Sequence, residues 1–320
     1  TLTDQQYGQD GEAIYSVSRG DLNLLLLTLA DQQKNVSIKF DHKCVDVDLK
    51  TATAIFENKE GQEFEVKADR IIGADGTYSA IRSKMMRQDR FQYSQNFIEH
   101  GYKELTIPAN EDGSYKLEKN ALHIWPRGNF MLIALPNMDG SFTCTLFLPY
   151  DGKYSFNNLK TDDQILNFFK DVFSDTLDLI PDILHDYKNN KTASLSIMRC
   201  DPWTVSDKVL LIGDAAHATV PFYGQGMNAS FEDVYVFDTV LNQFEGDWSI
   251  VFSEFQKQRK IDTDAIADLA IDNYYEMRDH VANPLFKEKR IVEMNLEKYF
   301  PTEYFSKYSL VTFNEYIGYH

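Results

Sequence analysis

The chain has 320 residues, of which 43% are hydrophobic and 25% are charged. This composition is typical of a globular protein with one large domain or two ordinary ones. The formal net charge of −17 argues against nucleic acid or an anionic membrane surface as the main partner.

The cysteines, histidines and apolar runs argue against a disulfide-stabilised protein, a metalloprotein and a membrane-spanning protein. The three cysteines form no Cys-x-x-Cys pair, which favours reduced thiols in a soluble, cytoplasmic protein over a disulfide framework. The seven histidines show no ligand spacing, so no metal site is predicted. The apolar run at residues 22–30 is far shorter than the roughly 20 residues that span a membrane, so we expect no membrane segment.

The first part of the chain predicts short strands around two helices. A strand is predicted at residues 13–19, and the next helix, which Asp21 can cap, has a leucine-rich run that predicts a buried face. A second helix, at residues 78–87, follows a β-meander. Basic side chains in and after it are expected on one solvated face: Arg82, Lys84, Arg87 and Arg90. The strands of the meander are predicted at residues 36–40, 44–49, 53–56 and 63–66.

A short apolar strand that ends in an acidic residue occurs twice, ending at Asp75 and at Asp214. Doubly wound sheets bind nucleotides through a carboxylate at the carboxyl end of a parallel strand. After Asp214, Gly224 and Gly226 open a helix whose N–H groups and dipole suit an anionic or phosphate-bearing ligand. An ordinary strand–loop–helix connection has the same spacing, so that alternative stays open.

The middle of the chain predicts an antiparallel sheet. Alternation places Met131, Ile133 and Leu135 on one face, either as core or as the floor of an apolar pocket, and the pattern alone favours core. The strands are predicted at residues 102–107, 121–125, 130–135 and 141–148, with a hairpin turn at residues 136–140. Helices at residues 161–173 and 181–187 and a strand at residues 194–199 follow.

The last part of the chain predicts long helices with a break at Asn283-Pro284. Asn273, Glu276 and Met277 lie at positions i, i+3 and i+4, so they share a helix face. A polar helix edge would give the same pattern.

Two motifs resemble those of the single-component FAD-dependent aromatic hydroxylases. GDAAH from Gly213, followed by GQGMN from Gly224, resembles the second flavin motif of that family, and GADG from Gly73, with Ser79 and Arg82, resembles its Asp-Gly motif. Further strings narrow the resemblance to members that hydroxylate kynurenine, and they extend from Tyr7 to Phe313. Among them are ALHIWP at residues 121–126, VPF at residues 220–222, Asn273-Tyr274 and Tyr308-Ser309.

The resemblance implies an α/β fold, α+β overall. A doubly wound FAD-binding domain would carry an inserted antiparallel-sheet substrate domain and a C-terminal helical segment. The family's N-terminal βαβ unit with Gly-x-Gly-x-x-Gly, its carboxylate-pairing arginine and its final helices have no counterpart in this sequence, so the FAD-binding domain is expected to be incomplete. The implied division is substrate-domain strands at 1–17, FAD-binding domain at 18–95 and 201–260, substrate sheet at 96–200 and helical region at 261–320.

The implied activity is NADPH-consuming hydroxylation of L-kynurenine to 3-hydroxykynurenine in tryptophan catabolism, with FAD as the cofactor and O2 as the oxidant. The oxygen would pass to the ring through a flavin C4a-hydroperoxide. The flavin would carry the chemistry, so no residue is assigned as a catalytic acid or base. The protein would be a monomer or a homodimer.

The resemblance also assigns residues to the two ligands. For FAD they are Arg19 near the phosphates or the NADPH path, Asp75 in the motif loop, Asp214 on the ribityl chain, and Gly226, Met227 and Asn228 at the flavin pyrimidine edge. For the substrate they are Tyr7, Asn273 and Tyr308 on the carboxylate, Glu276 and Met277 at the same end, Gln225 on the carbonyl or aniline group, and Leu122, Met131, Ile133, Leu135, Phe147, Pro221 and Phe222 around the ring.

Structural roles are expected for His217 as a hydrogen-bonding residue and for Cys144 and Cys200 as packing residues. Two alternative functions remain open. One is a hydroxylase of another aromatic acid, and the other is a non-catalytic, ligand-binding remnant of such an enzyme.

Overall fold

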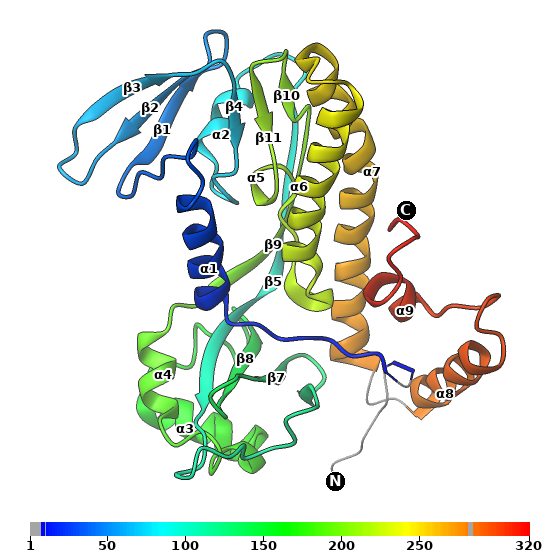
Figure 1. Ribbon diagram of the computed structural model, residues 1–320. Coiled ribbons are helices and arrows are strands. Elements are labelled where there is room, and N and C mark those ends of the chain that lie inside the picture. Colours follow the sequence, from blue (N-terminus) through cyan, green and yellow to red (C-terminus); the bar gives the residue numbers. More distant parts are fainter. Residues whose placement is uncertain (1–7, 10, 281–283) are drawn as a thin grey trace. The chain divides into compact units, whose positions relative to one another are not determined.

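The computed structural model describes residues 8, 9, 11–280 and 284–320 (Figure 1). The chain divides into two compact units. Unit 1 comprises Thr1–Val36, Phe97–Leu195 and Tyr274–Ser309, and unit 2 comprises Ser37–Asn96, Ser196–Asn273 and Leu310–His320. The finer domain boundaries implied by the resemblance stay a prediction.

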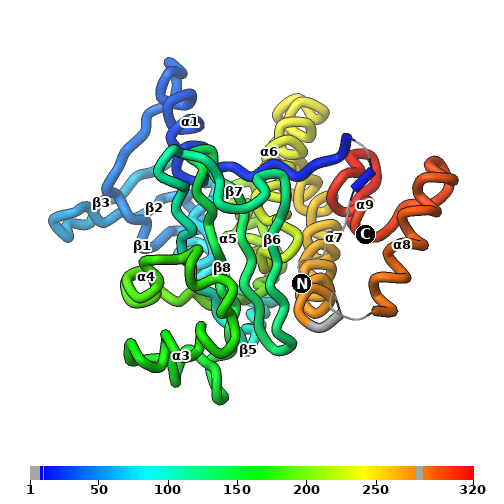
Figure 2. The backbone as a smooth tube through the Cα atoms, turned by 90° about the horizontal axis from the view of Figure 1, so that it is seen from below, coloured from blue at the N-terminus to red at the C-terminus, as the bar shows by residue number. Residues whose placement is uncertain are grey.

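A five-stranded sheet forms the centre of unit 1, in the order β6-β7-β8-β5-β9. Figure 2 shows β6, β7 and β8 side by side, and adjacent strands among β6, β7, β8 and β5 pair antiparallel, as the sequence predicts. The strands are β5 (Gln92–Ile107), β6 (His123–Pro126), β7 (Met131–Pro136), β8 (Phe142–Pro149) and β9 (Ala193–Asp201).

The two faces of this sheet differ in what they pack against. Leu132 and Ala134 of β7 join Leu146 of β8 in a core closed by α3 (Asp162–Val172) and α4 (Ile183–Asn189). Successive side chains of a strand point to opposite faces, so Met131, Ile133 and Leu135 lie on the other face and are not part of this core. Met131 is fully buried, whereas Ile133 and Leu135 are half-buried, so the assignment of this stripe to core or to a pocket floor stays a prediction. The short 3-10 helix η1 (Ser174–Thr176) follows α3.

Unit 2 contains a small mixed sheet in the order β10-β11-β4. β11 runs parallel to β4 in the register Val209↔Ile71 and Leu211↔Gly73, which is the pairing expected of a doubly wound fold. The core of unit 2 surrounds β11. The elements are β4 (Ile71–Gly73), β10 (Thr204–Val205), β11 (Val209–Leu211), α2 (Ala80–Met85), α5 (Asp214–His217), η2 (Pro221–Tyr223), α6 (Gln225–Gln243) and α7 (Trp248–Tyr275).

The predicted meander has three strands and not four. β1 (Lys43–Asp48), β2 (Thr53–Glu57) and β3 (Glu63–Lys67) pair antiparallel in that order. The strand predicted at residues 36–40 is wrong, because that segment pairs with no strand in the described part of the chain.

Three predictions about the start of the chain are also wrong: the strand at residues 13–19, Asp21 as the helix cap, and a buried leucine-rich face. Residues 12–18 have no regular structure. The helix α1 (Arg19–Asp31) follows them, and Ser18 caps it by accepting a hydrogen bond from the backbone N–H of Asp21. None of the 13 described residues of α1 is buried, and Leu24 is 65% exposed. The leucine-rich run therefore forms an exposed apolar surface on this helix.

In the described part of the chain, three further helical elements come after α7. A π-helical turn, η3 (Glu276–His280), continues α7, and α8 (Pro284–Tyr299) begins at the predicted proline, a residue favoured at the first helical position. A last short helix, α9, spans Lys307–Thr312. Across the described residues, no helix is both long enough and apolar enough to cross a membrane. The described histidines, cysteines and acidic residues form no group of three that could hold a metal ion.

We expect Leu146→Ala to lower the free energy of unfolding by about 2–5 kcal/mol, because it opens a cavity in the core of unit 1. The matched control is Met138→Ala in the β7–β8 turn, where Met138 is 95% exposed and the change should stay within about 0.5 kcal/mol. Urea unfolding of both variants measures the difference. Equal effects would contradict the assignment of this core.

Candidate functional site

The turn after β11 places one acidic side chain at the surface of a buried region. Asp214 is exposed, whereas Gly213 before it and Ala215 after it are buried. Gly213 has φ 61° and ψ −144°, and an added Cβ would lie 3.2 Å from Ser230 Oγ, so only glycine fits this turn. The result is a carboxylate at the end of a parallel strand, where it can accept hydrogen bonds from ligand hydroxyls.

A buried ionic network holds this turn in place. Asp233 of α6 accepts from the Gly213 N–H at 3.0 Å and from His217 Nε2 at 2.6 Å through one oxygen. Its other oxygen accepts from Arg259 Nε of α7 at 2.8 Å. Arg259 also reaches Glu232 at 2.9 Å and the Ala229 carbonyl at 3.2 Å. One carboxylate thus fixes the β11–α5 turn against two long helices.

The charge of Asp233 follows from these contacts. Burial alone would raise the pKa of its carboxyl, but the hydrogen bonds and charges of His217 and Arg259 outweigh burial and hold the pKa below its usual value. His217 is thus a structural hydrogen-bonding residue, as predicted. No sequence pattern points to Arg259, which lies outside the flavin motifs.

A buried arginine ties the Asp-Gly motif to the GDAAH motif. Arg82 Nη1 donates to the Ala215 carbonyl of α5 at 2.8 Å, and Nη2 donates to the Thr77 carbonyl. The prediction that Arg82 lies on a solvated helix face is wrong, since the residue is 4% exposed. Asp75 caps α2 by accepting from the N–H of Ala80 at 2.8 Å and of Ile81 at 3.3 Å, so it shapes the motif loop.

The N-terminus of α6 gathers several predicted ligand-binding residues. Asn228 Nδ2 donates to Gln225 Oε1 at 2.9 Å, and the Tyr319 hydroxyl donates to the same oxygen at 3.3 Å. Asn273 of α7 donates to the Phe222 carbonyl of η2 at 2.8 Å. Tyr319 is a contact that the sequence did not predict, because its position in the chain is remote from every motif.

This helix end fits the electron-rich edge of a flavin. Gly224, at φ 70°, precedes the 19-residue helix, and among the described residues no side chain caps its first N–H groups. Free amides at the positive end of a helix dipole stabilise negative charge. Pro221 begins η2 before this helix, and Met227 is half-exposed on its first turn. Together with the exposed Asp214, unit 2 has donors and an acceptor that suit FAD.

The predicted ring-binding residues of unit 1 share one face of its sheet. The register pairs Met131 with Phe147 and Ile133 with Ile124, and Leu135 lies further along the same face of β7. Leu122 directly precedes β6. This is the face away from the α3 and α4 core, so its apolar side chains do not serve that core.

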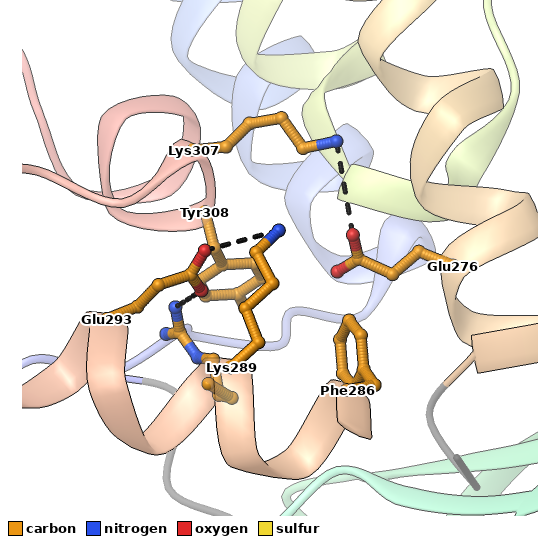
Figure 3. A pocket seen from close by; sticks show the side chains of 7 residues that line it. Glu276, Phe286, Lys289, Glu293, Lys307 and Tyr308 are labelled. Carbon is orange, nitrogen blue, oxygen red and sulfur yellow. Dashed lines mark hydrogen bonds and ion pairs between the residues drawn. The ribbon is translucent and has the colours of Figure 1, made fainter. Parts of the chain in front are cut away.

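A separate pocket in unit 1 brings Glu276 and Tyr308 together (Figure 3). Lys307 lies 4.0 Å from Glu276, and Lys289 of α8 lies 3.4 Å from Glu293. The other lining residues are Phe286 and Arg290 of α8. Met277 is buried next to Glu276 but does not line this pocket.

The remaining residues singled out in the sequence lie outside these clusters or outside the described part of the chain. Arg19 is the exposed first residue of α1. Tyr7 lies outside the described residues. Cys144 and Cys200 are buried, and burial raises the pKa of both thiols to about 12, which agrees with packing roles.

Comparison with known proteins agrees with the flavin-binding features. A family described as "FAD binding domain" matches residues 3–248. The kynurenine 3-monooxygenase of Flavobacterium psychrophilum is 49% identical over 318 residues, which cover 98% of this chain and 70% of the relative. The chain belongs to the kynurenine 3-monooxygenase family. The kynurenine 3-monooxygenase of Dictyostelium discoideum is 45% identical over 325 residues, again covering 98% of this chain and 70% of the relative.

Solved structures show the fold of this kynurenine 3-monooxygenase family member. A mutant of 2-methyl-3-hydroxypyridine-5-carboxylic acid oxygenase matches with a TM-score of 0.65 and 20% identity, covering 85% of this chain and 70% of that one. Tetracycline destructase Tet(51) matches with a TM-score of 0.59 and 21% identity, covering 86% and 73%. The FAD cofactor and the fold class predicted from the motifs are thus confirmed, whereas the individual site residues stay predictions.

We expect Asp233→Asn to lower the free energy of unfolding at pH 7 by roughly 3 kcal/mol, because Arg259 keeps a buried charge with only Glu232 to pair it. The carboxylate stabilises the fold above its unfolded pKa, and this stabilisation is lost as the pH falls below 3.8 through the folded pKa. The variant should therefore be less sensitive to acid than the wild type. Urea unfolding across pH measures both effects.

The matched control is Glu232→Gln, which removes a 42%-exposed carboxylate from the same arginine. It should cost less than about 1 kcal/mol. An Asp233→Asn variant as stable as this control would show that the network does not hold the turn.

Proposed function

We propose that this chain catalyses the NADPH-consuming, FAD-dependent hydroxylation of L-kynurenine at the ring position ortho to the amine, giving 3-hydroxykynurenine. The observation that carries the proposal is 49% identity to a kynurenine 3-monooxygenase over 98% of the chain. The exposed Asp214 and the uncapped start of α6 among the described residues support it, because both suit a flavin.

FAD, when bound, supplies the electron transfer and oxygen activation that no protein side chain provides. Asp214 accepts hydrogen bonds from the hydroxyls of the flavin's ribityl chain. The first amides of α6, from Gly226 to Asn228, donate to the pyrimidine edge and stabilise negative charge there. The Asp233 network keeps the Asp214 turn in a fixed position, so little reorganisation is needed when the cofactor binds.

The substrate is held through its two ends. Met131, Ile133 and Phe147 of unit 1 provide an apolar surface for the aromatic ring. Tyr308 donates its hydroxyl proton to the amino-acid carboxylate. Asn273 stays a predicted carboxylate contact, and its amide donates to the Phe222 carbonyl at 2.8 Å.

We expect the purified chain to bind FAD and to oxidise NADPH faster when L-kynurenine is added, with 3-hydroxykynurenine as the product. Flavin absorbance after reconstitution with FAD measures binding, and chromatography measures the product. Salicylate is the control acid. Stimulation and hydroxylation with salicylate, but not with kynurenine, would favour a hydroxylase of another aromatic acid. A chain that binds FAD and kynurenine but forms no product would be a ligand-binding protein.

We expect Tyr308→Phe to weaken L-kynurenine binding about tenfold to hundredfold, because a hydrogen bond to a charged group contributes roughly 1.5–3 kcal/mol. Equilibrium titration of the FAD-loaded protein with kynurenine measures the dissociation constant. The matched control is Tyr299→Phe on α8, where the side chain is 71% exposed and no change is expected. An unchanged dissociation constant for Tyr308→Phe would remove Tyr308 from the substrate site.

A further inference from the structure

The segment that precedes Tyr308 is held by a compact set of buried polar contacts. The Ser306 N–H donates to Glu297 Oε1 at 2.7 Å, and Arg290 Nη1 donates to Ser306 Oγ at 3.0 Å. Ser306 Oγ also accepts from the Ser309 N–H at 3.3 Å and donates to Ser309 Oγ at 3.1 Å, which caps the first turn of α9. We call Arg290, Glu297, Ser306 and Ser309 the Ser306 cluster.

Two charged residues of α8 are buried to make these contacts. Arg290 is 4% exposed and Glu297 is 6% exposed, and the seven-residue spacing places both on one face of α8. Burial would raise the pKa of Glu297, but hydrogen bonds from Ser309 and Ser306 and the charge of Arg290 hold it below its usual value. Buried charges are costly, and among the described residues the ion pair of Arg290 is with Glu293 at 3.4 Å and not with Glu297. Stability alone is therefore a weak reason for this cluster.

The same arginine contacts Tyr308 itself. The guanidinium carbon of Arg290 lies 5.7 Å from the centre of the Tyr308 ring, within the range of a cation–π interaction. Figure 3 shows Tyr308 facing α8, beside the side chains of Lys289 and Glu293. Arg290 thus constrains the tyrosine ring, while Glu297 and Ser306 constrain the backbone two residues before it.

We propose that the Ser306 cluster is a positioning device that sets the orientation of the Tyr308 hydroxyl and thereby the affinity for the substrate carboxylate. This inference rests on the proposed function, because it requires Tyr308 to bind kynurenine. Glu297 and Arg290 touch no substrate in this scheme, and they act only through Tyr308. A rigid supporting set of contacts reduces the ordering that a binding group must undergo when the ligand arrives.

A double-mutant cycle tests the proposal. Glu297→Gln, Tyr308→Phe and the double variant are compared with the wild type, all loaded with FAD, and the dissociation constant for L-kynurenine is measured by equilibrium titration. Glu297→Gln alone should weaken kynurenine binding about threefold to tenfold, and it should have no further effect once the Tyr308 hydroxyl is absent. FAD affinity should not change.

The matched control is Glu288→Gln, the same substitution at an exposed position of the same helix, which should bind kynurenine as the wild type does. If Glu297→Gln fails to fold, Ser306→Ala takes its place in the cycle, because it removes the Oγ contacts without changing charge. Unfolding by urea establishes that each variant is folded.

The outcomes separate the inference from the proposed function. A wild-type chain that binds FAD but no kynurenine would contradict the proposed function and, with it, this inference. Wild-type binding with an unaffected Glu297→Gln variant would overturn the inference alone. An equal loss of affinity with and without the Tyr308 hydroxyl would also overturn it, because the cluster would then act independently of that group.

Discussion

The arrangement of unit 2 depends on one buried carboxylate. Asp233 is fully buried on α6 and accepts hydrogen bonds from Gly213, His217 and Arg259 at once. These partners belong to the β11–α5 turn and to α7, so a single side chain joins the sheet to both long helices. Burying an aspartate is unfavourable unless every oxygen is satisfied, and here both are. The exposed Asp214 lies between two residues that Asp233 holds, Gly213 and His217, so the same contacts restrict the turn that carries it.

The sheet of unit 1 has two different apolar faces, because successive side chains of its strands point in opposite directions. Side chains of β7 and β8 that face α3 and α4 form the core, and their immediate neighbours in sequence form a second apolar face. The two sets interleave along the chain, so either face can change without altering the other. The pocket residues Glu276 and Tyr308 lie instead in the turn η3 and at the start of α9.

The sequence predicts those parts of the fold and site that depend on local pattern. Alternation located β7 and β8, and the two flavin strings located Asp75 and Asp214. Prediction from local pattern fails where contacts between distant parts of the chain determine the structure. Residues 36–40 alternate like a strand but pair with none of the described strands. Arg82 has the pattern of a surface residue, although it is buried and donates to the carbonyls of Ala215 and Thr77. Arg259 and Glu297 likewise carry no signal, because a charged helix residue looks the same whether it faces water or a buried partner.

The tie made by Arg82 has a consequence for how this protein can evolve. Both of its acceptors are main-chain carbonyls, at Thr77 and Ala215, so the contact does not depend on the side chains at those two positions. A substitution at either position leaves the carbonyl acceptor in place, although Ala215 is itself fully buried in the core of unit 2. The contact therefore depends on the identity of residue 82 alone, because the single ammonium group of a lysine cannot donate to both carbonyls with the planar geometry of a guanidinium.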